Sequence, residues 1–304
     1  MIYYLSYSLL YLFSLLPLRV LYLIGDCFYL LIYYLLRYRV DVVMKNLSIA
    51  FPKKTEKEKR KIAKQFYRNF TDTFIETIKL ISAGEKFMKK HFTGNMEVLN
   101  DLFKEGKKCQ VHLGHNFNWE LASIATPLYV PYLMLIVYMP IKNKTLDRIF
   151  KKIRARTGVI LLSAQEMRTS IKPYLDQQYL LALVADQNPG DTRNHYWGSF
   201  FGRPTPFVKG PESGARANHA AVVFCNITKK RRGYYKVHFE LASADPAELP
   251  EKELTRRYIR YLERVITAHP EMWLWSHRRW KHQWKPEYKE QWVDDIPAPQ
   301  THLI

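Results

Sequence analysis

His115 and Glu120, with four residues between them, directly follow the short apolar run 109–114. The pattern predicts a buried strand that ends before His115 and a helix that begins near 119, so the two side chains lie at a strand-to-helix junction. A histidine there has its ring at the edge of the sheet, where α/β proteins commonly bind ligands. If Glu120 accepts the Nδ1–H of the ring, Nε2 is free to take a proton from a hydroxyl group. The pair therefore predicts a general base with an orienting carboxylate, as in a triad whose hydroxyl belongs to the substrate.

The residues around this junction have to hold the two side chains in place. Asn116 or Asn118 is suited to cap the helix that follows, and Glu120 falls in its first turn, where a carboxylate is favoured. A histidine and a carboxylate at this spacing also occur in segments with a purely structural role. The rest of the chain must therefore decide between the two interpretations.

Short apolar runs alternate with helical patterns from about residue 95 onward. The predicted strands are 109–113, 132–138, 159–162, 180–185, 221–227 and 234–241, and the predicted helices are 95–104, 119–126, 145–156 and 254–268. Strands interleaved with helices of this length are typical of an α/β domain. We therefore expect a mixed sheet flanked by helices.

A long amphipathic helix is predicted over 56–82. Its apolar stripe is formed by Ile62, Phe66, Phe70, Phe74, Ile78 and Ile81. Its first half carries Lys57, Lys59, Arg60, Lys61, Lys64 and Arg68. These cations form either a solvated face or a surface that contacts anionic lipid headgroups.

Residues 2–36 are almost wholly apolar and contain eight tyrosines. Pro17 and Arg19 divide them into two stretches, each at the short limit for crossing a bilayer. Tyrosine favours the headgroup boundary, so we expect membrane association, either as one tilted span or as a monotopic hairpin in one leaflet. A buried helix of a water-soluble domain is the alternative. The cluster of lysines and arginines that follows predicts that the main domain lies on the cytoplasmic side.

The composition limits the classes of partner and site. The formal net charge is +19, which attracts anionic lipids, phosphorylated substrates, acidic proteins or nucleic acid. No nucleic-acid-binding motif is present, so we expect no nucleic acid partner. Three distant cysteines, Cys27, Cys109 and Cys225, argue against a disulfide framework and a zinc site, so no metal is expected.

The chain is predicted to divide into three parts. These are a membrane anchor over 1–36, a catalytic domain over 37–284 and a loose tail over 285–304, which is rich in charge and proline. Tryptophans near His277, Arg278 and Arg279 suggest a patch at the membrane interface. These three basic residues are rivals for acid–base or phosphate-binding work, but a structural or membrane-facing role is favoured for them.

Several blocks, in order along 1–282, give the chain a resemblance to a known family. The first is His115 with Asn118-Trp119-Glu120, and the second is Arg154-Ala155-Arg156-Thr157-Gly158. Asp186-Gln187, Phe201-Gly202 with Thr205 and Gly210, and Trp273 with His277-Arg278-Arg279 follow. Together they resemble the lipid A late acyltransferases, the lauroyl and myristoyl transferases of the lysophospholipid acyltransferase superfamily. Phe117 stands where glycine is usual in that family.

The resemblance implies a glycerolipid-acyltransferase-like fold and a role for each matching residue. His115 would be the general base and Glu120 its partner, while Asn118, Asp186 and Gln187 would border the substrate. Arg154 and Arg156 are candidates for holding a phosphate. Residues two positions apart on a helix point to different sides, so we expect only one of the two to face the site. The alternative for both is a solvated helix end.

The resemblance also implies the substrates. A fatty acyl chain would pass from a thioester of acyl-carrier protein or coenzyme A to a hydroxyl of a lipid A precursor, without a bound cofactor. The reaction would take place at the bacterial inner membrane. Another lipid acceptor, such as a lysophospholipid, a glycerophosphate or an aminolipid, is the main alternative. A basic membrane-binding module without catalytic activity is a further alternative.

Overall fold

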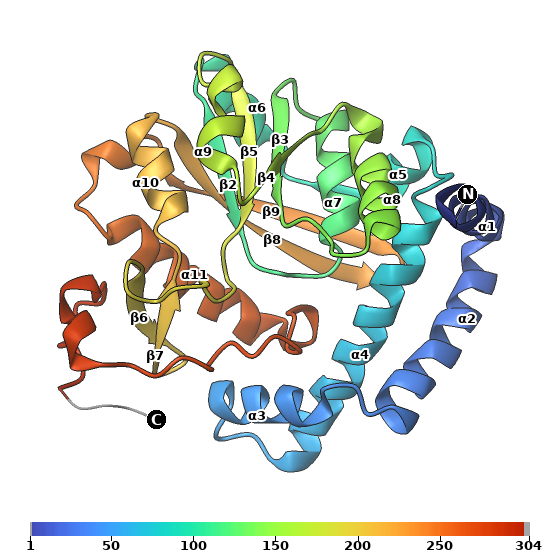
Figure 1. The fold of residues 1–304 in the computed structure, drawn as a ribbon, viewed down its shortest axis with the longest axis horizontal. Coiled ribbons are helices and arrows are strands. Elements are labelled where there is room, and N and C mark those ends of the chain that lie inside the picture. Colours follow the sequence, from blue (N-terminus) through green and yellow to red (C-terminus); the bar gives the residue numbers. More distant parts are fainter. Residues whose placement is uncertain (1, 301–304) are drawn as a thin grey trace.

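A seven-stranded, mostly parallel sheet forms the centre of the protein (Figure 1). The computed structural model describes residues 2–300. The strand order is β1-β9-β8-β2-β5-β3-β4, and only the pair β8–β9 is antiparallel. The strands are β1 (Phe92–Gly94), β2 (Cys109–Leu113), β3 (Leu133–Tyr138), β4 (Ile160–Ser163), β5 (Tyr179–Val184), β8 (Ala221–Arg231) and β9 (Tyr234–Ser243). The expected mixed α/β sheet is confirmed.

Helices flank this sheet and cover its ends (Figure 1). They are α1 (Ile2–Leu15), α2 (Leu18–Leu30), α3 (Val40–Ala50), α4 (Glu56–Lys79), α5 (Glu85–His91), α6 (Glu97–Lys104), α7 (Trp119–Ala125), α8 (Lys144–Arg154), α9 (Met167–Ser170), α10 (Gly210–Ala217) and α11 (Glu253–Ala268). The strand β2 agrees with its prediction residue for residue, and the other predicted elements agree within a few positions. Alternation and helical periodicity therefore found six of the seven strands of the sheet, and the three-residue strand β1 was not predicted.

A separate two-stranded hairpin, β6 (Tyr196–Phe200) and β7 (Arg203–Phe207), was not predicted as strands. Its turn is formed by Phe201 and Gly202, both at positive φ, 52° and 72°. Prolines interrupt β7, so its sequence lacks the usual strand pattern.

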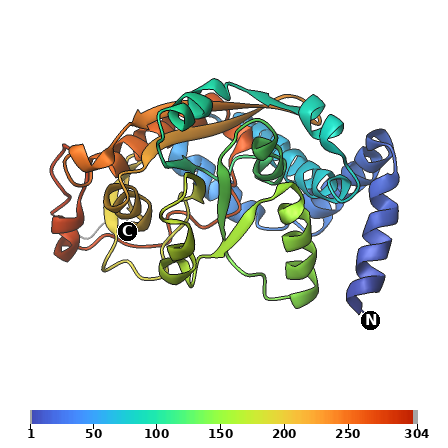
Figure 2. The ribbon, with the colours of Figure 1, turned by 90° about the horizontal axis from the view of Figure 1, so that it is seen from above.

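The apolar N-terminal residues form α1 and α2, separated at Pro17 as the sequence predicts. One side of α2, with Leu21, Gly25 and Tyr29, is buried, and α2 packs along α4. The outer sides of α1 and α2 leave many large apolar side chains exposed, including Leu5, Leu12, Leu23 and Leu35. The helical run Leu18–Leu35 is long and apolar enough to cross a membrane by length and composition alone. In Figure 2 these helices lie at one end of the molecule and the C-terminal segment at the other.

The helix α4 departs from its predicted stripe in its second half. Phe74 is 51% exposed, whereas Asp72 and Glu76 are buried. In the first half most of the basic side chains are exposed, which agrees with both a solvated face and a surface that contacts lipid headgroups. Two of them, Lys64 and Arg68, lie over the rings of Tyr34 and Tyr29, next to the N-terminal helices.

The C-terminal segment is packed, so the prediction of a loose tail over 285–304 is wrong for the described residues up to 300. Trp284, Tyr288 and Trp292 form a buried cluster with Trp197 of the hairpin. The interfacial tryptophan patch is also wrong, because Trp273 and Trp275 are fully buried. Aromatic residues in this region stabilise the core instead of meeting a membrane.

Candidate active site

His115 follows the carboxyl end of β2 and faces Asp186, which follows the end of the neighbouring parallel strand β5. The Nδ1 atom of His115 lies 2.5 Å from Oδ1 of Asp186. The backbone N–H of His115 donates to Oδ2 of the same carboxylate at 2.8 Å. The prediction that Glu120 accepts the Nδ1–H is therefore wrong, because Asp186 occupies that position. Neighbouring parallel strands have their carboxyl ends at the same edge of the sheet, so the residues that follow β2 and β5 lie close together.

The carboxylate of Asp186 is held in its ionised form. Only 1% of the residue is exposed, and burial by itself raises its pKa. The charge of His115 and its hydrogen bonds outweigh this effect, with a further bond from Nε1–H of Trp273 at 2.6 Å, and lower the pKa to about 2. An ionised carboxylate against Nδ1 fixes the ring orientation and stabilises an imidazolium.

Gln187 contacts the other nitrogen of the imidazole. Its Nε2 amide lies 3.0 Å from Nε2 of His115. With the Nδ1 proton directed at Asp186, Nε2 carries the lone pair and accepts from the amide. The basic nitrogen of His115 therefore points away from Asp186 toward Gln187, a residue of the cavity wall.

Glu120 is bound to a different residue, Arg154 at the end of α8. The Nε–H of Arg154 donates to Oε2 of Glu120 at 2.9 Å, and an Nη2–H donates to Oε1. The indole of Trp119 donates to the same carboxylate at 3.1 Å. The carboxylate thus has a bidentate cationic partner, and both residues line the cavity.

The two other predicted binding residues are directed away from the cavity. Arg156 donates to the backbone carbonyls of Leu80 and Ile81, beyond the end of α4. Of the two arginines, only Arg154 lines the cavity. Asn118 is fully buried and caps α7, accepting from the N–H of Leu121 at 3.1 Å. The predicted capping role is confirmed, and no atom of Asn118 reaches the cavity wall.

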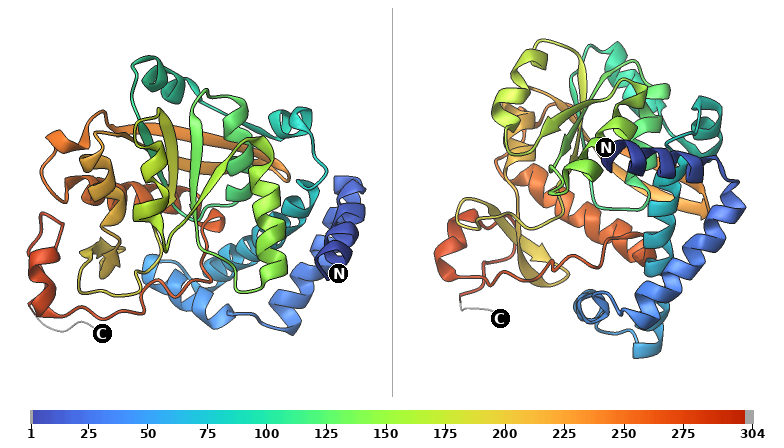
Figure 3. Two further views of the ribbon diagram at one scale, coloured as in Figure 1. Left: turned by 45° about the horizontal axis from the view of Figure 1, so that its top comes forward. Right: turned by 45° about the vertical axis from the view of Figure 1, so that its right-hand side comes forward.

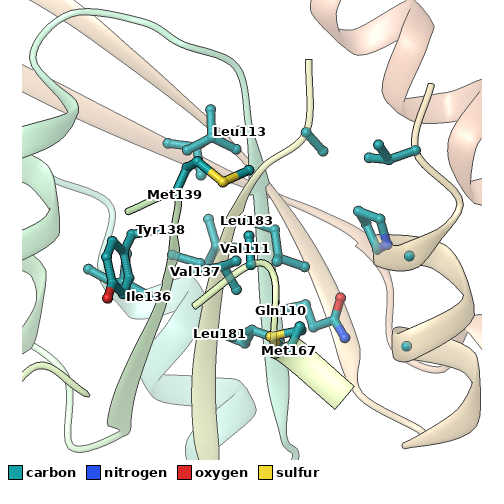
Figure 4. A pocket seen from close by; sticks show the side chains of 18 of the residues that line it. Gln110, Val111, Leu113, Ile136, Val137, Tyr138, Met139, Met167, Leu181 and Leu183 are labelled. Carbon is teal, nitrogen blue, oxygen red and sulfur yellow. The ribbon is translucent and has the colours of Figure 1, made fainter. Parts of the chain in front are cut away.

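A cavity of about 1270 Å³ opens beside these groups. His115, Glu120, Arg154 and Gln187 form a polar part of its lining. Apolar side chains from β2, β3 and β5 line another part, and Figure 4 shows Val111, Leu113, Ile136, Val137, Leu181 and Leu183 gathered there. One wall includes Met139, which is 64% exposed. The Nε2 side of His115 and a set of apolar side chains therefore line the same cavity.

The C-terminal basic residues support the loop after Asp186. Nε2 of His277 accepts from the backbone N–H of Asn188, and burial lowers the pKa of His277 to about 4. Arg279 is fully buried and donates to Oδ1 of Asn188 and to the carbonyl of Pro206. Of the two roles favoured from the sequence, these contacts agree with the structural one.

Sequence reasoning missed the partner of His115, although Asp186 was among the candidates. The available signal was its position directly after a buried strand, the same position that His115 has. Trp273 belongs to the last of the family-like blocks, and its bond to Asp186 has no local sequence signal. Among residues 2–300, no group of three His, Cys, Asp or Glu side chains is placed to hold a metal ion.

Comparison with known proteins gives the family. Residues 1–282 match the family described as bacterial lipid A biosynthesis acyltransferase. The chain is 22% identical over 251 residues to the lipid A biosynthesis palmitoleoyltransferase of Escherichia coli (strain K12), covering 81% of this chain and 80% of the relative. It is 21% identical over 240 residues to the lipid A biosynthesis acyltransferase 2 of Shigella flexneri, covering 76% and 74%. The chain therefore belongs to the bacterial lipid A biosynthesis acyltransferase family.

Proposed function

We propose that this protein transfers a fatty acyl chain from an acyl-carrier-protein thioester to a hydroxyl of a lipid A precursor, with His115 as general base and Asp186 as its partner. The observation that carries the proposal is the His115–Asp186 contact at the edge of a large, partly apolar cavity. Membership of the family supplies the reaction class.

In the proposed reaction, Nε2 of His115 removes the proton of the acceptor hydroxyl. The alkoxide oxygen attacks the thioester carbon, and the tetrahedral intermediate collapses with loss of the thiolate. The imidazolium then returns the proton to the sulfur, while Asp186 stabilises its positive charge. Gln187 has to release Nε2 before the hydroxyl can approach, which places its amide beside the reacting atoms.

The lining of the cavity and the net charge of the protein support the choice of substrates. The apolar part of the cavity suits an acyl chain, and the net charge of +19 favours an acidic carrier protein and a phosphorylated acceptor. Coenzyme A as the donor is the alternative, and no bound cofactor is needed. In this proposal Arg154 interacts with the acceptor, while Glu120 holds its guanidinium in place.

We also propose that α1 and α2 bind the cytoplasmic leaflet of the inner membrane without crossing it. The inner side of α2 packs along α4, and the first turns of α4 carry exposed charged residues that cannot enter hydrocarbon. The exposed apolar sides of both helices are left to face lipid. Anionic lipids would contact the lysines and arginines nearby.

Acyl transfer by the purified protein tests this function. Acyl-carrier-protein thioesters and a purified lipid A precursor are supplied in mixed micelles, and the product is measured by mass spectrometry. We expect transfer by the wild-type chain and loss of transfer by His115→Ala. Transfer to a lysophospholipid, glycerophosphate or aminolipid, with none to the lipid A precursor, would replace the proposed acceptor.

A further inference from the structure

A buried carboxylate in the second half of α4 links three separate parts of the protein. Glu76 is 6% exposed and accepts hydrogen bonds from three side chains. The hydroxyl of Tyr22 donates at 2.7 Å, the hydroxyl of Tyr235 at 2.8 Å and the amide of Asn118 at 2.7 Å. Burial raises the pKa of Glu76, and the three donors offset part of this cost.

The bond to Asn118 fixes the start of the helix that follows His115. An asparagine amide has two ends, and only its oxygen can accept the N–H of Leu121 as a cap. Because Glu76 accepts from the Nδ2 end at 2.7 Å, the Oδ1 end is turned toward Leu121. Glu76 thereby sets the orientation of the cap three residues after His115.

The bond to Tyr22 brings the apolar helix α2 into the same network. A second link lies beside it, because Arg232 in the β8–β9 turn pairs with Asp26 of α2 and with Asp72 of α4. Asp72 also binds Lys229 at 3.0 Å. Asp72 and Glu76, the two buried carboxylates of α4, therefore connect α2 to the hairpin β8–β9, and of these two only Glu76 continues to Asn118. Figure 3 shows α2 running beside α4, and α1 beside α8.

We propose that Glu76 is a positioning residue that makes the docked helix α2 part of the active site, by holding the Asn118 cap and with it the segment that carries His115. The N-terminal helices then have two roles on two sides. Their outer sides face lipid in the proposed function, and the inner side of α2 orders the catalytic segment. Loss of the inner contacts lowers the turnover of an enzyme that still binds membranes and substrates.

The test compares two tyrosine-to-phenylalanine changes in the full chain in detergent micelles. Tyr22→Phe removes one donor to Glu76, whereas Tyr4→Phe makes the same change on α1 at a residue that is 65% exposed. We expect kcat to fall roughly tenfold in Tyr22→Phe, the size of one hydrogen bond to a charged group, with KM within about twofold. Tyr4→Phe should match the wild-type protein.

Hydrogen–deuterium exchange supplies a readout that does not depend on acyl transfer. Peptides covering 114–125 should exchange faster in Tyr22→Phe and in Glu76→Leu, while those covering β5 stay protected. Glu76→Gln should remain near wild type, because its carbonyl still accepts from Asn118 and its amide can donate to the oxygen of Tyr22. If Glu76→Leu does not fold, the Tyr22→Phe comparison carries the test.

Equal exchange and equal kcat in Tyr22→Phe and Tyr4→Phe would overturn the positioning role. The measurement of kcat rests on the proposed function, whereas the measurement of hydrogen–deuterium exchange does not. An enzyme that is inactive on every acceptor but shows the expected exchange pattern would contradict the proposed function alone.

Discussion

The two ends of the motif at 115–120 have opposite surroundings. His115 contacts the carboxylate of Asp186 and the amide of Gln187, both at the end of β5. Glu120 contacts the guanidinium of Arg154, at the end of α8. Each charged or basic group thus has a partner from another segment, and neither end of the motif bonds to the other. A short spacing between two reactive residues is therefore no guide to whether they act as a pair.

The difference follows from where the backbone turns. His115 still belongs to the edge of the sheet, next to β5, whereas Glu120 lies in the first turn of α7. A carboxylate that already has a bidentate guanidinium partner gains little from turning to an imidazole. Asp186, by contrast, has two hydrogen-bond donors in His115 and one in Trp273.

The largest effect is expected at the imidazole itself. Replacing His115 with alanine removes the only proposed base, so kcat should fall by roughly 10³-fold or more. Membrane association should stay close to wild type, whereas the thermal unfolding midpoint should fall, because the buried carboxylate of Asp186 loses its imidazole partner. The measurement is acyl transfer from a radiolabelled thioester. Retention of more than a tenth of the activity would remove His115 from the mechanism.

Two isosteric changes test whether Asp186 or Glu120 is the partner of His115. Asp186→Asn should lower kcat by roughly 10²- to 10⁴-fold, because an amide does not stabilise an imidazolium. Glu120→Gln should lower it roughly tenfold, through looser holding of Arg154. Steady-state kinetics of both variants under one condition decide the order. A larger loss of kcat in Glu120→Gln than in Asp186→Asn would favour the pairing of His115 with Glu120 that the sequence predicts.

The pairing of Glu120 with Arg154 predicts non-additive effects. Single changes Glu120→Gln and Arg154→Met each leave one partner of a largely buried ion pair uncompensated. The double variant should therefore be more stable than the sum of the single losses predicts, by roughly 1–3 kcal/mol. Chemical denaturation of the four proteins in the cycle measures this coupling. Strict additivity would mean that the two side chains act independently.

The smallest effect is expected at a second histidine, His112, on the strand β2 that precedes His115. His112 is fully buried beside Gln110, and burial lowers its pKa to about 3. The unfolded chain binds a proton near pH 6.5 and the folded chain does not, so this histidine makes stability fall as the pH drops below 6.5. His112→Gln should reduce the slope of unfolding free energy against pH by about 1.4 kcal/mol per unit between pH 6 and 4.

Kinetics of the same variant separate the role of His112 from that proposed for His115. His112→Gln should leave kcat unchanged near neutral pH, because its side chain contacts Gln110 and the ring of Tyr258. An unchanged slope would show that His112 is protonated in the folded protein, contrary to its burial.

The sequence by itself determined most of the elements, their order and the candidate reactive residues, but not the short strand β1 or the hairpin β6–β7. Alternation and periodicity gave β2, β5, α7 and α8 within a few residues, and the ordered blocks gave the family that the comparison confirms. These features are local, because each depends on neighbours a few positions away along the chain.

Only the tertiary structure decided which residues meet. The contact of His115 with Asp186 depends on β2 and β5 being adjacent in the sheet, although 71 positions separate the two residues. The burial of Glu76 and of the C-terminal tryptophans likewise depends on partners from distant segments. A local pattern assigned the tryptophans near His277 to the membrane interface, and it gave no role to Glu76. Their partners lie across the fold, and strand order and helix packing are not encoded in the period of any one segment.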